Sequence, residues 1–327
     1  MKSHTRKTVT LLICMAIFLA IPALAAEPGT PPPENQAPAT ENLEITTYRG
    51  VGVGGTLIAV DPEGDLFEFQ IVRSPRKGEI TLNQATGQFT YTPLEGKRGR
   101  DHFTYVAIDA LGNISAEATV RIRIERQSRQ VYYEDMSGHE AHFAAISLAE
   151  RDIFVGEQIG GRHFFNPDAP VRRGEFLAMS MRLADTDLLS GIVRTGFADD
   201  AYIPAWLRPY VSTAVLDGVI TGLRRSNGDL IFAPNTYITA SEASVILNNV
   251  LGLPDVPVAA LSAEIAAPVW AQQATVNLSA RNIISLDHPP VYHSALTRAD
   301  VAQMLLGAAH LLEGRTAPPP SLLGWAT

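Results

Sequence analysis

Three short motifs in the second half of the chain end in an acid at the spacing that starts a helix. The acids are Glu175, Glu242 and Asp300, which lie 67 and 58 residues apart. Thr239 and Thr297 precede the second and third acids by three residues, which is the spacing of a capping box. Such a cap stabilises a helix by about 0.5–2 kcal/mol. The motifs therefore predict three helix starts, and capping alone accounts for the acids of the second and third motifs. The first motif has Arg172 where the cap residue should be and lacks that side-chain acceptor.

Capping does not account for the arginines in two of these motifs. Arg173 and Arg298 fall in the first helical turn, where a cation opposes the helix dipole. Such an arginine needs a partner, which is either an ion-pairing or packing partner in the protein or a bound anion that the helix amides also hold. A sugar carboxylate suits the second interpretation. The motif of Glu242 has Ala240 in place of the arginine, so an anion site there would be weakened.

Two tryptophans, Trp206 and Trp270, stand at the start of the helices that precede the second and third motifs. Such a ring either stacks on the apolar face of a sugar or fills a core. Other chemistry is not visible, because the sequence has no Gly-x-Ser-x-Gly and no phosphate-binding loop after a strand. Carboxylates occur at turns and helix starts, with no recognisable catalytic pair. These residues favour binding over catalysis.

The motifs belong to a unit that occurs three times. The most complete copy, 197–253, begins with Phe197 and Asp199 and continues through a helix, a Gly-Val-Ile-Thr-Gly turn and a Phe-x-Pro loop to the capped helix. The first copy repeats this plan. The third copy lacks the acidic start and the Phe-x-Pro loop. Repeats of this length determine the architecture of a chain.

The repeated pattern resembles the S-layer homology (SLH) module, whose hallmark is a Thr-Arg-Ala-Glu-like motif in each of three tandem copies. The resemblance covers 132–312. It implies two helices per copy and an all-α pseudo-trimer, in which three copies share one core around a pseudo-threefold axis. It also implies a secondary cell-wall polysaccharide with acidic, often pyruvylated, sugars as the ligand. The residues expected to contact this polymer are Arg173, Glu175, Trp206, Glu242, Trp270, Thr297, Arg298 and Asp300.

Residues 43–126 have the pattern of an all-β module. Short alternating runs, of which 118–124 is the clearest, are separated by turns, and roughly seven strands of this kind predict a β-sandwich. The phrases at 60–65, 87–93 and 99–105 resemble a bacterial cadherin-like or immunoglobulin-like module. That resemblance implies a stalk or an adhesion module.

Some modules of this kind bind calcium, which takes six to eight oxygen ligands. An Asp-Pro-x-Gly-Asp segment is equally an ordinary turn, in which the aspartate bonds its own backbone. Calcium therefore stays an alternative to plain turn formation, and no other cofactor is expected. The candidate ligands are Asp61, Glu63, Asp65, Asp101 and Asp109.

The beginning of the chain predicts secretion. A basic start, an apolar stretch at 9–21 and a small-x-small site at 23–25 are typical of a cleaved signal peptide, with an uncleaved anchor as the alternative. Cleavage would remove three of the 26 basic residues and Cys14, the single cysteine, which excludes disulfides and thiol chemistry. The remaining chain is more acidic than the full net charge of −8, which argues against nucleic acid or an anionic lipid surface as the partner. No later apolar run is long enough to span a membrane.

The apolar content of 46% and the charged content of 18% fit folded domains. We expect a multidomain chain made of the following parts: signal peptide 1–25, Pro-rich linker 26–42, β-sandwich 43–126, repeats at 132–190, 191–254 and 255–314, and a tail at 315–327.

The sequence thus predicts a non-catalytic, secreted protein at the cell wall or S-layer, which displays a β-sandwich and attaches through its repeats. The alternatives are a wall-remodelling hydrolase with its catalytic part in 43–126, and a structural S-layer subunit. The sugar of the polymer, the active grooves, the ligand of the β module, calcium dependence and the oligomeric state are left open.

Overall fold

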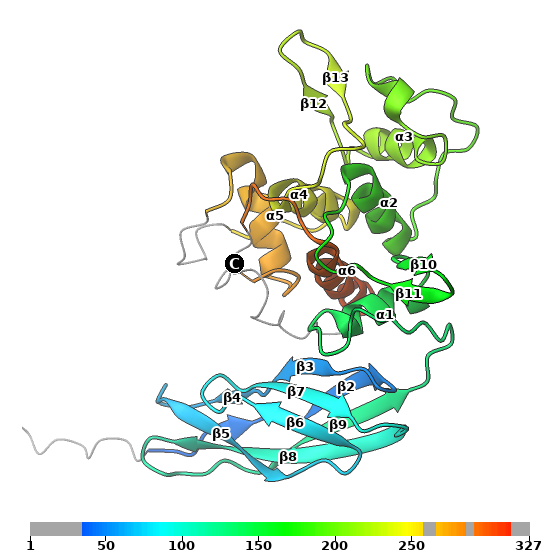
Figure 1. Cartoon of the computed structure of the whole chain (residues 1–327). Coiled ribbons are helices and arrows are strands. Elements are labelled where there is room, and N and C mark those ends of the chain that lie inside the picture. The colour runs from blue at the N-terminus through cyan, green and yellow to red at the C-terminus, as the bar shows by residue number, and fades with distance from the viewer. Residues whose placement is uncertain (1–34, 258–265, 286–290, 315–327) are drawn as a thin grey trace, which may run out of the picture. The chain divides into compact units, whose positions relative to one another are not determined.

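The structure is a computed structural model that describes residues 35–257, 266–285 and 291–314. The predicted signal peptide (1–25), most of the predicted linker (26–42) and the tail (315–327) lie outside the described residues. Strands form the first part of the described chain and helices the second (Figure 1).

Two larger sheets and one two-stranded pair form the β region. The four-stranded sheet has the order β2-β9-β8-β5, with β2 and β9 parallel and the other neighbours antiparallel, and the three-stranded sheet has the order β3-β7-β6. β1 and β4 pair with each other, so a short strand occurs within the range predicted as linker. The strands are β1 (Ala39–Thr40), β2 (Leu43–Tyr48), β3 (Val53–Thr56), β4 (Ala59–Val60), β5 (Phe67–Arg73), β6 (Gly78–Leu82), β7 (Gln88–Pro93), β8 (Gly99–Asp109) and β9 (Ala118–Glu125).

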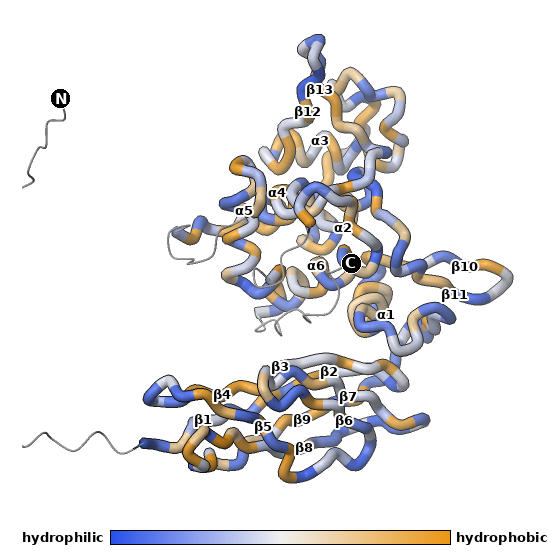
Figure 2. The backbone as a smooth tube through the Cα atoms, turned by 60° about the vertical axis from the view of Figure 1, so that its left-hand side comes forward, coloured by the Kyte–Doolittle hydropathy of each residue, from blue (hydrophilic) through white to orange (hydrophobic). Residues whose placement is uncertain are grey.

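Alternation along each strand builds the core of the β region. In β9 the side chains of Val120, Ile122 and Ile124 are buried, whereas those of Arg121 and Arg123 are exposed, as the period of two in a strand requires. The same alternation is visible as apolar and polar colours along the strands in Figure 2. The prediction of an all-β module is confirmed.

Among the described residues, the helical region contains two α-helices in each predicted repeat. They are α1 (His142–Glu150) and α2 (Arg173–Leu183), α3 (Arg208–Leu216) and α4 (Ala240–Val250), and α5 (Val269–Ser279) and α6 (Arg298–Leu312), with a short 3₁₀ helix η1 (Asp200–Tyr202). Two small hairpins also occur, β10 (Glu157–Ile159) with β11 (Arg162–Phe164) and β12 (Leu223–Arg224) with β13 (Leu230–Ile231). The second hairpin ends in a hydrophilic tip (Figure 2). The region is therefore helical with two β-hairpins, rather than purely α.

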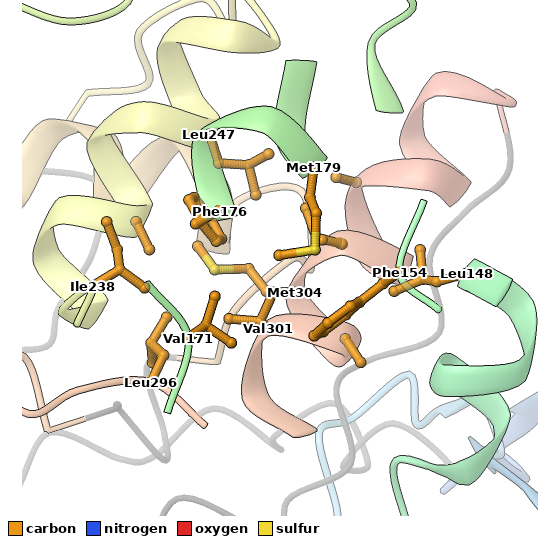
Figure 3. Close-up of a cluster of buried hydrophobic side chains, with 14 of the residues drawn as sticks. Leu148, Phe154, Val171, Phe176, Met179, Ile238, Leu247, Leu296, Val301 and Met304 are labelled. Atoms are coloured by element: carbon orange, nitrogen blue, oxygen red, sulfur yellow. The ribbon is translucent and has the colours of Figure 1, made fainter. Parts of the chain in front are cut away.

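The three residues that precede the second helices form a closed ring of backbone hydrogen bonds. The amide of Val171 donates to the carbonyl of Leu296, that of Leu296 to Ile238, and that of Ile238 to Val171, at 3.0, 2.9 and 2.9 Å. All three side chains are buried and lie together beside the core (Figure 3). Phe176 and Met304, from α2 and α6, are buried in the same core.

This ring makes the packing of the helices cyclic. α2 packs against α3, α4 against α5, and α6 against α1, so the second helix of each repeat meets the first helix of the next. We name these contacts junction 1–2, junction 2–3 and junction 3–1.

The first helices of the three repeats also end alike. The amides of Ile153, Val219 and Ile283 each donate to a carbonyl five residues earlier, at 3.0, 2.8 and 3.0 Å. This shared turn fixes which residues of the three repeats are equivalent, independently of the motif spacing.

Candidate functional site

The helix starts follow the predicted capping chemistry in two repeats. Thr239 Oγ1 accepts from the amide of Glu242, whose carboxylate accepts from the amide of Thr239 at 3.1 Å. Thr297 and Asp300 make the same two bonds, at 3.2 and 2.8 Å. Both acids are thereby oriented in the first turn of their helices.

In the first repeat only half of this cap exists. Arg172 occupies the position of the threonine, and its side chain cannot accept a hydrogen bond. The carboxylate of Glu175 still accepts from the amide of Arg172, at 3.0 Å. Glu175 itself is exposed.

Arg173 is held by the protein's own groups rather than displayed to solvent. It is 5% exposed, its Nε donates to the carbonyl of Phe232 at 3.1 Å, and its Nη1 lies 3.2 Å from Oε1 of Glu242. Burial lowers the pKa of the guanidinium, and the carboxylate of Glu242 opposes that change. A guanidinium remains charged in either case. The partner that this first-turn cation needs is thus the next repeat.

Arg298 occupies the equivalent position at junction 3–1. Its Nε donates to the carbonyl of Phe165 at 2.5 Å, and its guanidinium lies over the rings of Phe154 and Phe165, at 4.4 and 5.0 Å from their centroids. Burial lowers its pKa, and the charges of Glu157 and Glu175 oppose that change. Nη2 of Arg298 is buried and has no hydrogen-bond partner among the described residues.

The acids that open the first two repeats hold the Phe-x-Pro loops. Asp199 accepts from the amides of Phe232 and Ala233, at 2.9 and 2.7 Å. Asp135 accepts in the same way from Phe165 and the residue after it, at 2.9 and 2.6 Å. The recurring aromatic-x-Asp start marks these acids in the sequence, but their partners lie about thirty residues away.

The third repeat has an aromatic residue at the corresponding place, although it lacks the Phe-x-Pro loop. Tyr292 is 5% exposed, and its carbonyl accepts from both the amide and the hydroxyl of Ser241, at 3.2 and 2.9 Å. The carbonyls of Phe232 and Phe165 accept from arginine at the other two junctions. A serine contact therefore replaces the arginine contact at junction 2–3, where Ala240 stands at the arginine position.

Both tryptophans are on the surface. Trp206 is 56% exposed and Trp270 is 61% exposed, so neither fills the core. The residue that follows each tryptophan is buried, and it lies seven positions before the carbonyl that accepts the hydrogen bond of the shared turn. Glu140 in the first repeat has the same position relative to that turn. Junctions 1–2 and 2–3 thus present an indole where junction 3–1 presents a carboxylate.

At junction 3–1 the charge of Asp300 acts on Glu140. Partial burial and the nearby charge of Asp300 raise the pKa of Glu140, and Gln303 opposes this by hydrogen bonding. Burial likewise raises the pKa of Asp300, with a further contribution from Asp168, while its bonds to Thr297 lower it. The motif acid of one repeat therefore lies within electrostatic range of the residue that is equivalent to tryptophan in the next.

The candidate calcium ligands cap turns in the β region. Asp61 Oδ1 accepts from the amides of Glu63 and Asp65, at 3.0 and 2.9 Å, while its Oδ2 is buried without a hydrogen-bond partner among the described residues. Asp101 accepts from two amides and from the hydroxyl of Tyr91. Asp109 accepts from the amides of two nearby turn residues.

No group of three or more histidine, cysteine or acidic side chains among the described residues is placed to hold a metal ion. Within the same ranges, no helix has the length and apolar character that crossing a membrane requires.

A family model for the bacterial cadherin-like domain matches residues 35–126. This confirms the prediction of a cadherin-like module and is consistent with an extracellular or surface location. The family models detect no SLH repeat in the chain. No curated protein matches the sequence.

Solved structures resemble the chain over about a third of its length. The SrpA adhesin of Streptococcus sanguinis is 16% identical over 32% of this chain and 65% of that one, with a TM-score of 0.26. Domains EC1-2 of human protocadherin-24 are 15% identical over 28% and 45%, with a TM-score of 0.24. A putative alpha-galactosidase of Bacteroides fragilis is 18% identical over 28% and 18%, with a TM-score of 0.23. The chain spans less than two thirds of the length of each.

Proposed function

We propose that the helical region is a non-catalytic, SLH-type domain that attaches the protein to a bacterial cell wall by binding a secondary cell-wall polysaccharide. The three repeats form a pseudo-trimer, and the polymer lies in the grooves at its junctions. The cadherin-like module is displayed as a stalk or an adhesion module. The protein is secreted and held at the surface by this domain.

One observation carries this proposal. Indoles that are more than half exposed occupy equivalent positions at two junctions of a closed three-repeat ring, at Trp206 and Trp270. A large exposed aromatic ring is costly to leave in water, and it stacks well on the apolar face of a sugar. Its recurrence at equivalent positions of two repeats favours a ligand over chance exposure.

Repetition also supports an anchoring role. Two sites on one rigid ring can engage one polymer chain together, and the second engagement is then effectively intramolecular. Weak individual sites therefore suffice to hold the protein on a wall that carries many copies of the same sugar.

The test is co-sedimentation of the protein with purified cell walls, before and after chemical removal of their secondary polysaccharide. We expect binding to the intact walls, and loss of binding both after polymer removal and in the double variant Trp206→Ala/Trp270→Ala. Leu216→Ala is the matched control, because Leu216 is 71% exposed at the other end of α3. Binding that survives both polymer removal and the double variant would refute wall anchoring through the junctions.

A further inference from the structure

We infer that the two exposed tryptophans are unequal: Trp206 makes junction 1–2 the principal polysaccharide site, and Trp270 makes junction 2–3 an auxiliary one. Tyr210 holds the indole of Trp206 and is therefore a positioning residue, which acts on the polymer through the tryptophan. This inference rests on the proposed function and ranks its sites.

The two tryptophans stand in the same kind of backbone turn. Each follows a proline by two residues, and the carbonyls of Pro204 and Pro268 accept from the amide of the residue after the tryptophan, at 3.0 and 2.8 Å. Two residues after each tryptophan, a side chain donates to the carbonyl five positions before it. These donors are Nε of Arg208, at 3.2 Å, and Nε2 of Gln272, at 3.1 Å. The turns therefore match, and the two sites differ in what supports them.

Arg208 fastens the turn of Trp206 more extensively than Gln272 fastens the other turn. Its Nη1 donates to the carbonyl of Val193 at 2.6 Å, and its Nη2 lies 3.8 Å from Oδ2 of Asp200. A glutamine has one side-chain nitrogen and no charge, so it cannot supply such an ion pair. The turn of Trp206 is thus tied to η1 and to the loop before it.

The residue after Trp206 is anchored against α2. A Cβ on Gly174 would lie 2.5 Å from Cδ2 of Leu207, so the buried leucine occupies the space that this glycine leaves open. The residue after Trp270 is Ala271, whose single methyl group reaches less far and buries less apolar area. Leu207 therefore holds its turn against the neighbouring repeat more firmly than Ala271 does.

Tyr210 supports the indole itself. The rings of Trp206 and Tyr210 lie edge to face, with their centroids 6.5 Å apart and their planes at 70°. Tyr210 is half-buried and packs against the helical core, so it offers a fixed partner to an exposed ring. The equivalent residue of the third repeat, four positions after Trp270, is Ala274, which has no ring.

An indole that is already held in one orientation loses less side-chain freedom when it stacks on a sugar. The two indoles are exposed to a similar degree, so access does not distinguish them. Immobilising a free side chain weakens binding about two- to tenfold, and an edge-to-face ring contact has an effect of the same size. We therefore expect junction 1–2 to bind the polymer more tightly than junction 2–3 by about this factor.

The experiment measures dissociation constants by sedimenting increasing amounts of the protein with purified cell walls. Trp206→Ala should weaken binding about two- to tenfold more than Trp270→Ala does. Tyr210→Leu removes the ring but keeps an apolar side chain, and it should weaken binding about two- to tenfold. Tyr210→Phe keeps the ring and should restore the wild-type value. Tyr132→Leu is the matched control that should change nothing, because Tyr132 is 62% exposed and precedes the first helix.

Two further readouts separate positioning from a merely structural role. In the Trp206→Ala background, Tyr210→Leu should weaken binding no further, because the tyrosine acts through the indole. In the Trp270→Phe/Trp325→Phe background, Trp206 is the remaining tryptophan of three, and Tyr210→Leu should lower its fluorescence anisotropy without polymer because the indole gains freedom.

The outcomes also separate the ranking from the proposed function. If both tryptophan variants weaken binding but Trp270→Ala does so as much as Trp206→Ala, the ranking is wrong while wall anchoring stands; this comparison does not depend on the folding of Tyr210→Leu. If Tyr210→Leu changes neither affinity nor anisotropy, or weakens binding equally without Trp206, then Tyr210 does not position the indole. If the wild type does not bind walls, both the ranking and the proposed function are wrong.

Discussion

The ion pair between Arg173 and Glu242 links the first two repeats, and its removal should destabilise the helical region. Arg173→Met keeps much of the apolar stem but leaves the carboxylate of Glu242 and the carbonyl of Phe232 without their donor. Breaking a buried pair by removing one partner costs about 3–5 kcal/mol. The side chain of Glu242 is 20% exposed and keeps its bond to Thr239, so we expect the lower end of this range.

Urea denaturation followed by circular dichroism at a helical wavelength measures this effect, because the helical region supplies that signal. A loss of about 3 kcal/mol would lower the melting temperature of a unit of this size by about 6–12 °C. Arg172→Met is the matched control, since Arg172 is exposed, and we expect it to change the unfolding free energy by less than about 0.5 kcal/mol.

A double-mutant cycle decides whether the pair itself is responsible. Glu242→Gln removes the charge but keeps an acceptor for the cap, and the double variant Arg173→Met/Glu242→Gln removes both charges. We expect the double variant to be less destabilised than the sum of the single ones by about 2 kcal/mol. If the effects are additive, or if Arg173→Met unfolds like the wild type, then the pair does not hold the junction and our explanation of this arginine is wrong.

Three further predictions concern the repeats. Asp199→Ala removes the acceptor of two loop amides and should cost about 2–4 kcal/mol in the same denaturation assay; a cost near zero would show that the loop is held otherwise. Gly222→Ala should lower the free energy of unfolding by about 1–3 kcal/mol more than Gly228→Ala does. Both glycines have positive φ, but of the two only Gly222 would place a Cβ against an aromatic ring, at 2.4 Å. Equal losses of stability in the two variants would contradict this clash. The raised pKa of Asp300 predicts that its contribution to stability is greatest below its unfolded pKa and is lost as the pH rises through the folded pKa. Asp300→Asn should therefore gain stability relative to the wild type as the pH rises from the unfolded pKa of Asp300 through its folded pKa, and a difference that does not change with pH would refute the assignment.

Local spacing predicted the helix starts, because their chemistry is local. A threonine and an acid three residues apart satisfy each other within one turn, and α4 and α6 begin directly after Thr239 and Thr297. The alternation of β9 was equally readable, since a strand exposes and buries successive side chains.

The partners of the motif residues could not be read in this way. Arg173 bonds a carbonyl 59 positions later in the chain, and Asp199 bonds amides more than 30 positions later. These contacts exist only because the ring of Val171, Ile238 and Leu296 closes, and no single repeat contains the information for that closure. The role of Arg173 as a ligand contact remains a prediction, and its burial makes the structural partner the simpler explanation.

The contacts between repeats explain why a substitution in one repeat changes the charge environment of another. The motif cations of the first and third repeats act on the motif acid of the next repeat: Arg173 pairs with Glu242, and the charge of Glu175 acts on Arg298. The second repeat has Ala240 at the position of the motif cation. The motif acid of the third repeat, Asp300, therefore has no motif arginine from the preceding repeat. Burial raises the pKa of Asp300, and the carboxylate of Glu140 lies near it rather than an indole. Asp300 thus has neither a motif arginine from the preceding repeat nor a neighbouring indole. This distinguishes junction 3–1 from the two junctions that carry tryptophan.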